Sequence, residues 1–400
     1  MRVLATAALV VAGYGLAGCG GGAASGSADD AGAFVPPAGS DGGADVGSEA
    51  GGDRSDAAPP DATITGDASL ADAAPAVRFI GRVDRSGDAG PRFAWSGSTL
   101  VARFTGPTVG VRLADNGNYF AVLVDGTMQA MPLVTTAAQS DYPLAANLSP
   151  GPHELRLYRL TEASQGDTQW LGLTLDAAGS LLPAPAASVR RIELVGDSIS
   201  CGYGDTGMGP NCGFSLDTEN HYLSYGAITA RDLGAALITT AWSGKGMYRN
   251  YGGDMTDTLP VLYLRTLPDQ ATSAWDFAQY TPDVVVINLG TNDFATGDPG
   301  QPYADAYLAF ARMVRSRYPG AYIECTNGPM LADPSLSAAR GYITGVVSTM
   351  TAGGDSRVGY LEYPTQSASN GLGCDYHPSV TTHQLMAAQL TAALKAALGW

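Results

Sequence analysis

The pattern of hydrophobic and polar positions changes twice along the chain. Residues 20–76 are rich in Gly, Ala, Ser, Asp and Pro and contain almost no large apolar side chain. Residues 77–185 carry short alternating or β-branched runs separated by turn formers, a pattern typical of antiparallel strands. From residue 190 onward, short apolar runs alternate with longer helical patterns. These patterns predict a flexible tether, then an all-β domain, then an α/β domain.

The predicted all-β domain covers residues 77–185. Many short strands with turns between them favour a β-sandwich, and we expect a jelly roll. A Pro-Ala-rich stretch at 183–187 marks its expected end. The clearest strand patterns lie at residues 100–104, 109–113, 119–124, 153–158 and 170–175.

The predicted α/β domain covers residues 190–400. Alternating strands and helices indicate a parallel sheet covered by helices on both faces, in three α/β/α layers. In such sheets ligands bind at the carboxyl ends of the strands. The strand patterns lie at 192–195, 236–241, 284–288, 321–324 and 358–361, and the helical patterns at 222–233, 303–317, 337–350 and 380–398.

The first nineteen residues indicate export. Arg2 precedes an apolar run at 3–17, which is too short to span a bilayer and is typical of a signal peptide. The small residues before Cys19 favour a lipoprotein signal in which Cys19 is lipidated, and an ordinary signal peptide cut nearby is the alternative. We therefore expect a bacterial cell-envelope lipoprotein or a secreted protein, which contacts the membrane only through a lipid anchor.

Composition and charge argue against two classes of binding partner. The chain has 22 Lys and Arg against 38 Asp and Glu, and its formal net charge is −16. This balance argues against a nucleic-acid partner, which requires a basic surface. Lys245 and Lys395 are the two lysines of the sequence, so no basic run exists for anionic lipid. We expect a monomer.

Four residues with chemical potential follow four of the predicted strands. Ser198 follows the first strand with a hydroxyl, Gly244 the second with an accessible backbone N–H, and Asn292 the third with an uncharged amide donor. His377 follows the last strand. A serine, a histidine and two neutral donors at one edge of a sheet are what acyl transfer requires.

The other three histidines are weaker candidates for the base. His153 lies in a predicted strand, where packing or a carbohydrate contact is expected. His221 lies near a predicted helix start, where a capping or surface role is expected, and His383 lies inside the last helix. His377 is therefore the expected general base.

The order of these residues resembles that of the SGNH/GDSL hydrolases, which carry Ser, Gly, Asn and His in four short blocks. The resemblance implies that Ser198 is the nucleophile and that the Ser198 N–H, the Gly244 N–H and the Asn292 side chain form the oxyanion hole. It implies neither a metal nor another cofactor. The Gly-x-Ser-x-Gly motif of the α/β-hydrolases does not occur in the sequence, which argues against that other serine-esterase fold.

A narrower resemblance is to carbohydrate esterase family 2. The β domain before the hydrolase is similar, and so are the segments 196–204, 217–220, 242–246 and 374–378. That family removes acetyl groups from polysaccharides such as xylan and glucomannan, so an acetylated polysaccharide is the implied substrate. Another acetylated ester, such as peptidoglycan or a surface glycan, is one alternative. A tethered carbohydrate-binding protein with an inactive hydrolase domain is the other.

One position departs from the SGNH pattern. Most SGNH enzymes place the orienting aspartate three residues before the histidine, where this chain has Cys374, whereas Asp375 is two residues before His377. Either Asp375 completes a triad, or a Ser198–His377 dyad operates with a backbone carbonyl holding the imidazole. The sequence leaves both open.

Asp197 and Asp293 adjoin two of the reactive positions but carry negative charge. A carboxylate would repel the oxyanion, so we expect both to have structural roles. Aromatic side chains near the strand ends could instead form a sugar platform. The candidates for substrate binding are Tyr203, Trp242, Tyr248 and Tyr376.

Four cysteines remain after Cys19, an even number that suggests disulfides in an exported chain. We predict the pairs Cys201–Cys212 and Cys325–Cys374. Metal binding is the competing interpretation, and no CxxC or HxxxH spacing supports it.

Overall fold

The computed structural model describes residues 75–400, which belong to one compact unit. The predicted signal peptide, Cys19 and nearly all of the tether lie outside the described residues. Among the helices that are described, none combines the length and apolarity required to cross a bilayer.

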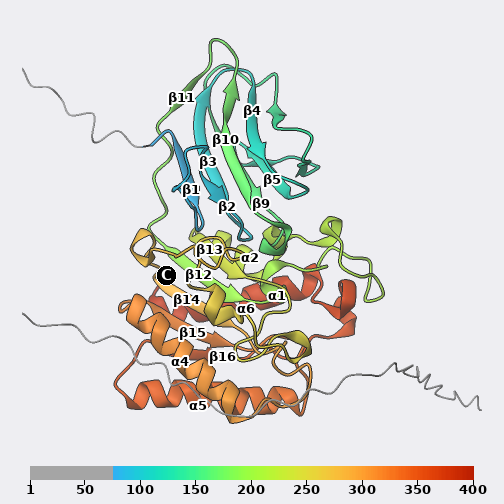
Figure 1. Cartoon of the computed structure of the whole chain (residues 1–400), viewed down its shortest axis with the longest axis vertical. Helices are drawn as coiled ribbons and strands as arrows, with labels where there is room; N and C mark the ends of the chain where they lie inside the picture. Colours follow the sequence, from blue (N-terminus) through green and yellow to red (C-terminus); the bar gives the residue numbers. More distant parts are fainter. Residues whose placement is uncertain (1–74) are drawn as a thin grey trace, which may run out of the picture. The chain divides into compact units, whose positions relative to one another are not determined.

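The N-terminal part is a sandwich of two antiparallel sheets, as the sequence predicts (Figure 1). One sheet has the order β1-β3-β9-β5-β6, with β11 paired to β3 and β7 to β5, and the other has the order β2-β10-β4-β8. Residues that alternate along the strands, such as Leu100, Phe120 and Leu155, point into the shared core. The strands are β1 (Val77–Ile80), β2 (Arg92–Phe93), β3 (Thr99–Thr105), β4 (Val109–Ala114), β5 (Tyr119–Val124), β6 (Thr127–Met128), β7 (Leu133–Val134), β8 (Asp141–Ala145), β9 (Pro152–Arg159), β10 (Thr168–Leu175) and β11 (Ser180–Leu182).

The C-terminal part is built on a parallel sheet of order β13-β12-β14-β15-β16, which confirms the predicted fold class. β12 and β14 are central and buried on both faces, because Ile, Leu and Val fill positions on both sides of each strand. The strands are β12 (Arg191–Gly196), β13 (Ala236–Ala241), β14 (Val284–Asn288), β15 (Tyr322–Thr326) and β16 (Val358–Leu361).

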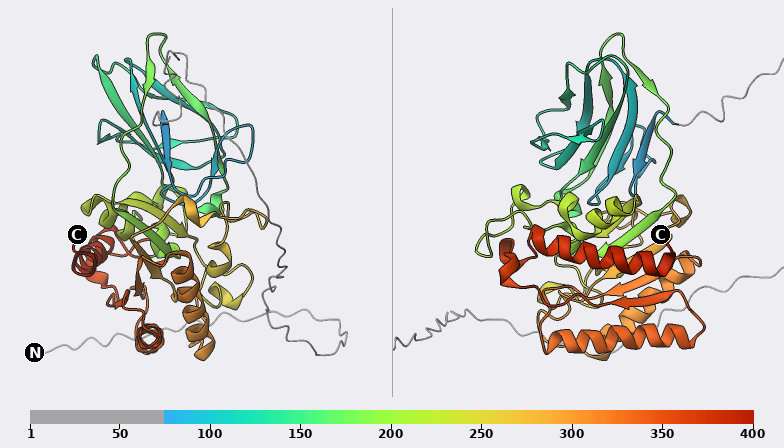
Figure 2. Two further views of the ribbon diagram at one scale, coloured as in Figure 1. Left: turned by 90° about the vertical axis from the view of Figure 1, so that its left-hand side faces the viewer. Right: turned by 180° about the vertical axis from the view of Figure 1, so that it is seen from behind.

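Helices cover both faces of this sheet (Figure 2). On one face, α4 and α5 pack against each other and against the strands, and on the other face α2 packs with α6. The predicted helix at 222–233 begins only at Tyr225, because Ser224 has an extended backbone and starts the helix as its N-cap. The helices are α1 (Ser198–Cys201), α2 (Tyr225–Asp232), α3 (Leu259–Leu262), α4 (Gln301–Arg317), α5 (Ser335–Ala352) and α6 (Val380–Leu398).

The β domain and the α/β domain share a buried polar interface. Arg82, just after β1, forms an ion pair with Glu193 of β12 at 2.8 Å, and both side chains are buried. The Tyr263 hydroxyl donates to the other oxygen of Glu193 at 2.9 Å. The indole of Trp95 donates to the carbonyl of Thr266 at 2.9 Å. Since a charge left unpaired inside a protein is costly, these contacts fix how the two domains meet.

His221 also belongs to this interface, so the predicted capping or surface role is wrong. Its side chain is fully buried. Nδ1 is hydrogen-bonded to the hydroxyl of Tyr158 in β9, and Nε2 to the hydroxyl of Thr239 in β13 at 2.9 Å. Burial lowers its pKa to about 3, so the ring is neutral. Two partners from distant strands explain why a local pattern could not place this residue.

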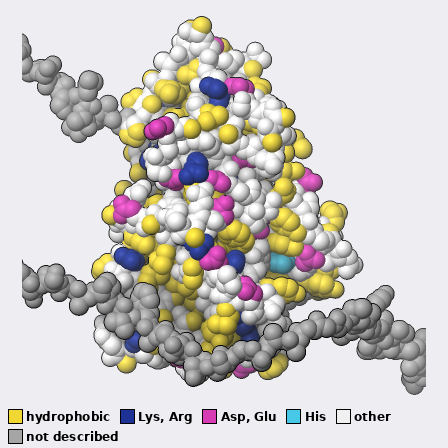
Figure 3. Space-filling model, viewed as in Figure 1, with side chains coloured by type: hydrophobic (Ala, Val, Ile, Leu, Met, Phe, Trp, Pro, Cys, Tyr) yellow, Lys and Arg dark blue, Asp and Glu magenta, His cyan; other side chains and the backbone are white. Residues whose placement is uncertain are grey.

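The surface mixes small groups of charged side chains with apolar and uncharged ones. On the face drawn in Figure 3, Lys and Arg are interspersed with Asp and Glu.

Candidate active site

Ser198 stands where β12 ends and α1 begins. The carboxylate of Asp197 accepts a hydrogen bond from the Ile199 N–H at 3.0 Å and so caps this short helix. A Cβ at Gly196 would lie 2.0 Å from the Ser200 hydroxyl oxygen, so the turn requires glycine. Asp197 therefore has the structural role expected for it, and Ser198 is presented at the carboxyl edge of the sheet.

His377 meets Ser198 directly. Its Nε2 lies 2.8 Å from the Ser198 Oγ, across 179 positions of sequence. Its Nδ1 lies 3.1 Å from the carbonyl oxygen of Cys374. Because a carbonyl can only accept, Nδ1 carries the proton and Nε2 is free to accept the serine proton. Burial of the imidazole lowers its pKa to about 4, which keeps the ring neutral at ordinary pH.

The carboxylate of Asp375 points to a different partner. It accepts a hydrogen bond from the Tyr203 hydroxyl at 2.6 Å, and the residue is exposed. Tyr203 in turn stacks on the imidazole of His377, with 4.1 Å between ring centroids. Of the two alternatives left by the sequence, the geometry is that of a dyad held by a backbone carbonyl, because Asp375 lines the pocket but its carboxylate bonds to Tyr203 and not to the imidazole.

Gly244 and Asn292 lie beside the dyad. Both line a pocket of about 740 Å³ together with Ser198 and His377. Gly244 has a φ of 80°, a left-handed conformation that favours glycine. Asn292 donates one amide hydrogen to the carbonyl of Lys245 at 2.9 Å, which leaves its second hydrogen for an oxyanion. The pocket therefore brings together the four residues that the sequence singled out.

Asp293 fixes the loop that follows β13. Its two carboxylate oxygens accept the backbone N–H groups of Met247, Tyr248 and Arg249 at 2.7–2.9 Å. Burial raises the pKa of this carboxyl group, and the three N–H bonds oppose that shift. The structural role of Asp293 is therefore to hold the Gly244 loop against the Asn292 loop.

The four aromatic candidates divide into two groups. Tyr203 and Tyr376 line the pocket, and Tyr376 is 59% exposed. Trp242 and Tyr248 pack against the hydrophobic core and do not line this pocket.

Sequence reasoning missed Tyr251, which is 72% exposed and lines the pocket. An aromatic residue followed by two glycines was the available signal. The other pocket-lining residues that it missed are Ser243, Thr291, Phe294, Ala295, Met330, Leu331, Ala332 and Ser335.

The predicted disulfides are wrong. Cys212 is bonded to Cys374, 162 positions away, and Cys201 and Cys325 are buried free thiols. The bond joins the loop after α1 to the loop of His377. Two backbone bonds run beside it, from Cys374 N–H to Gly204 O at 3.0 Å and from Asp375 N–H to Cys212 O at 2.9 Å. The histidine loop is therefore fastened to the serine loop.

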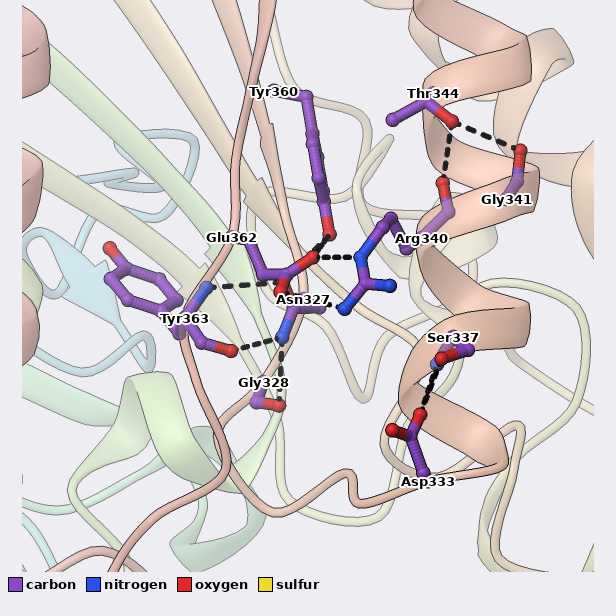
Figure 4. Close-up of polar contacts among 10 residues, drawn as sticks. All are labelled: Asn327, Gly328, Asp333, Ser337, Arg340, Gly341, Thr344, Tyr360, Glu362 and Tyr363. Atoms are coloured by element: carbon purple, nitrogen blue, oxygen red, sulfur yellow. Dashed lines mark hydrogen bonds and ion pairs between the residues drawn. The ribbon is translucent and has the colours of Figure 1, made fainter.

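A polar network supports the pocket wall that follows β15 (Figure 4). The buried side-chain amide of Asn327 donates to the carbonyl of Tyr363 at 2.7 Å. Its oxygen accepts from the Tyr363 N–H and from the Tyr360 hydroxyl. These bonds hold the ends of β15 and β16 together, and Met330 of the pocket lies three residues further along the chain.

Of the remaining histidines, His153 packs inside the β domain, where Nδ1 contacts Asp125 and Nε2 contacts the carbonyl of Ser149, each at 2.7 Å. His383 of α6 is buried and its Nδ1 accepts from the Tyr225 N–H. Neither lines the active-site pocket.

One group of described residues has potential metal-ligand spacing. Ligand atoms of Glu162, Cys201 and Glu219 lie within 4.8 Å of one another, and all three residues are buried. The oxygens of Glu162 already accept hydrogen bonds from the Ser243 N–H and the Ser164 hydroxyl. Glu162 of this group is therefore part of a buried hydrogen-bond network.

Comparison with known proteins agrees with this architecture. Residues 79–185 match the carbohydrate esterase 2 N-terminal family, and residues 194–385 match the GDSL-like lipase/acylhydrolase family. The chain is 43% identical over 328 residues to the cellulase/esterase CelE of Acetivibrio thermocellus, a match that covers 82% of this chain and 40% of CelE. The chain thus spans less than half of that relative.

A second curated relative and a solved structure match over most of their own length. An acetylxylan esterase/glucomannan deacetylase of Cellvibrio japonicus is 30% identical over 311 residues, which are 74% of this chain and 82% of that protein. The structure of a family two carbohydrate esterase from Clostridium thermocellum, in complex with cellohexaose, superimposes with a TM-score of 0.78 at 43% identity. It covers 81% of this chain and 99% of that one. The chain belongs to carbohydrate esterase family 2, a family of carboxylic ester hydrolases with a GDSL-type catalytic domain.

Proposed function

We propose that this chain is an exported serine esterase that removes O-acetyl groups from polysaccharide through an acyl-enzyme on Ser198. The observation that carries the proposal is the 2.8 Å contact between the Ser198 Oγ and the His377 Nε2, with Nδ1 held by the Cys374 carbonyl. This is the geometry that a general base needs to activate a serine hydroxyl.

The first half-reaction forms the acyl-enzyme. The His377 Nε2 takes the proton of Ser198 as Oγ bonds to the acetyl carbon, and the carbonyl oxygen becomes an oxyanion. The N–H groups of Ser198 and Gly244 and the amide of Asn292 stabilise that charge. The carbon–oxygen bond to the sugar then breaks, and the proton on Nε2 passes to the sugar oxygen.

The second half-reaction releases acetate. Nε2 takes a proton from water, the resulting hydroxide attacks the acetyl carbon, and the bond to Oγ breaks as the proton returns to Ser198. The same three donors stabilise the second oxyanion. The neutral ring implied by the lowered pKa of His377 is the form that both steps require.

The proposed substrate class is an acetylated xylan or glucomannan. Support comes from the names of the Cellvibrio japonicus relatives and from a pocket whose rim carries the exposed aromatic rings of Tyr251 and Tyr376. Such rings can pack against pyranose faces. Export is supported by the apolar run at 3–17 and by the Cys212–Cys374 disulfide, since disulfides persist in oxidising compartments.

Acetate release tests the proposal. Wild type and Ser198→Ala are assayed on acetylated xylan, acetylated glucomannan, O-acetylated peptidoglycan and p-nitrophenyl acetate. We expect Ser198-dependent release, fastest from the two plant-wall polysaccharides. Faster release from peptidoglycan would indicate that the substrate is a glycan of the cell surface instead of a plant-wall polysaccharide. Binding of polysaccharide without any acetate release would favour a binding protein with an inactive hydrolase domain.

A further inference from the structure

A glutamate of the β domain lies against the loop of Gly244. Glu162 belongs to the connection between β9 and β10 and is 4% exposed. Its Oε2 accepts a hydrogen bond from the Ser243 N–H at 2.8 Å. Ser243 directly precedes Gly244, so this bond is one residue away from a backbone N–H that the proposed mechanism uses as an oxyanion donor.

The carboxylate of Glu162 is itself held in place. Its Oε1 accepts from the Ser164 hydroxyl at 2.7 Å. Its backbone N–H donates to the Glu219 carboxylate at 3.1 Å, and its carbonyl accepts from the buried guanidinium of Arg159 at 3.0 Å. Because these partners fix both the backbone and the side chain, the acceptor for the Ser243 N–H is in position before substrate binds.

Glu162 also lies beside the serine helix. A carboxylate oxygen of Glu162 and the Cys201 Sγ are within 4.8 Å of each other. Cys201 is the last residue of α1, and Ser198 is the first. The same buried side chain therefore bonds to the loop of Gly244 and lies close to the end of the helix that begins with Ser198.

The other hydrogen bonds that hold the Gly244 loop do not involve the Gly244 N–H. The Gly244 carbonyl accepts from the Tyr251 N–H at 2.8 Å, and Asp293 holds residues 247–249 on the far side of the loop. Within residues 75–400, the Gly244 N–H donates to no protein acceptor. A bond on each side thus fixes the peptide that carries this free donor.

We propose that Glu162 is a positioning residue of the esterase, which aims the Gly244 N–H at the oxyanion and makes the β domain part of the active site. The inference rests on the proposed function. It assigns to the β domain a contribution to turnover that is separate from any binding of glycan.

The expected signature is a loss of kcat with little change in KM. The oxyanion exists only near the transition state, so a misaimed donor weakens transition-state binding and leaves ground-state binding nearly intact. Removing one oxyanion donor costs about 10²- to 10³-fold in turnover. Loosening a donor that remains present should cost less, about 10- to 100-fold.

The test compares Glu162→Ala with Glu162→Gln on p-nitrophenyl acetate. We expect Glu162→Ala to lower kcat about 10- to 100-fold with KM within about threefold of wild type. Glu162→Gln should restore most of kcat, because its amide oxygen can accept the Ser243 N–H while its NH₂ faces the Ser164 hydroxyl. Glu154→Ala, which removes a β-domain carboxylate paired with Arg156 at the surface, is the matched control. It should behave as wild type.

A further variant guards against misfolding of Glu162→Ala. Glu162→Asp keeps the buried acid but draws the acceptor back by one methylene, so kcat should fall again, and a cooperative thermal transition above the assay temperature shows that this variant is folded. Wild type and Ser198→Ala are measured alongside. If kcat is unimpaired in both Glu162→Ala and Glu162→Asp, the positioning role of Glu162 is overturned and the proposed function stands. If Ser198→Ala keeps wild-type activity, the proposed function itself is overturned.

Discussion

The carbonyl oxygen of Cys374 lies 3.1 Å from the Nδ1 of His377. This bond selects the tautomer that carries its proton on Nδ1, so the Nε2 that faces the Ser198 hydroxyl is unprotonated. Cys374 is also the half-cystine that joins the histidine loop to the loop after α1. One residue therefore orients the base through its carbonyl and fastens the base's loop through its sulfur.

Asp375 should matter little for turnover. Its carboxylate accepts from Tyr203 and not from the imidazole, so Asp375→Ala should lower kcat by less than about tenfold. Loss of a true third member of a triad costs about 10⁴-fold. Tyr203→Phe, which removes the hydroxyl that Asp375 binds, is the paired variant and should have a similarly small effect. A loss near 10⁴-fold in Asp375→Ala but not in Tyr203→Phe would show that Asp375 is the third member of a catalytic triad.

The disulfide should support both stability and turnover. Cys212→Ser should lower the free energy of unfolding by about 2–4 kcal/mol and reduce kcat, because it frees the loop that carries His377. Thermal unfolding and ester hydrolysis measure the two effects. Cys201→Ala removes a free thiol and should leave the disulfide intact. A peptide map that joins Cys201 to Cys212 would contradict the structure.

Activity should persist at acidic pH. The general base must be neutral, and burial lowers the pKa of His377 from 6.5 to about 4. Because kcat/KM follows the neutral form of the free enzyme, it should stay on a plateau as pH falls through 6.5 and reach half its maximum near pH 4. Samples returned to neutral pH control for unfolding. An acid limb near pH 6.5 would mean that the imidazole is solvated.

Asn292 should contribute on the order of 10²- to 10³-fold to turnover as an oxyanion donor. Asn292→Ala removes that donor and also the bond to the Lys245 carbonyl. Asn292→Asp keeps the shape but replaces donors with negative charge, so it should be at least as impaired. Turnover on p-nitrophenyl acetate measures both, and an undiminished kcat in Asn292→Ala would remove this residue from the oxyanion hole.

Local pattern was sufficient for most of the fold. β13, β14 and β16 have the bounds that their apolar runs predict, as does α6. Apolar runs bounded by polar or turn residues mark the ends of these strands, and β14, which is buried along its whole length, is the clearest case. The positions of Ser198, Gly244, Asn292 and His377 followed from the strand pattern as well, since these residues come after β12, β13, β14 and β16 respectively.

Contacts between distant segments could not be predicted from local sequence patterns. Cys212 pairs with Cys374 because two loops converge at the carboxyl edge of the sheet, whereas spacing favoured the nearer Cys201. His221 and Glu162 act across the boundary between the domains, and their neighbours in sequence carry no sign of those partners. The backbone carbonyl that replaces an aspartate beside His377 is likewise invisible in side-chain patterns.

Trapping the acyl-enzyme tests the central claim most directly. After rapid mixing with p-nitrophenyl acetate and acid quenching, mass spectrometry of the digested protein should find one acetyl group on the peptide that contains Ser198. His377→Ala should accumulate it far more slowly, and Ser198→Ala should not carry it at all while losing ester hydrolysis. Full turnover by Ser198→Ala or by His377→Ala would contradict the account.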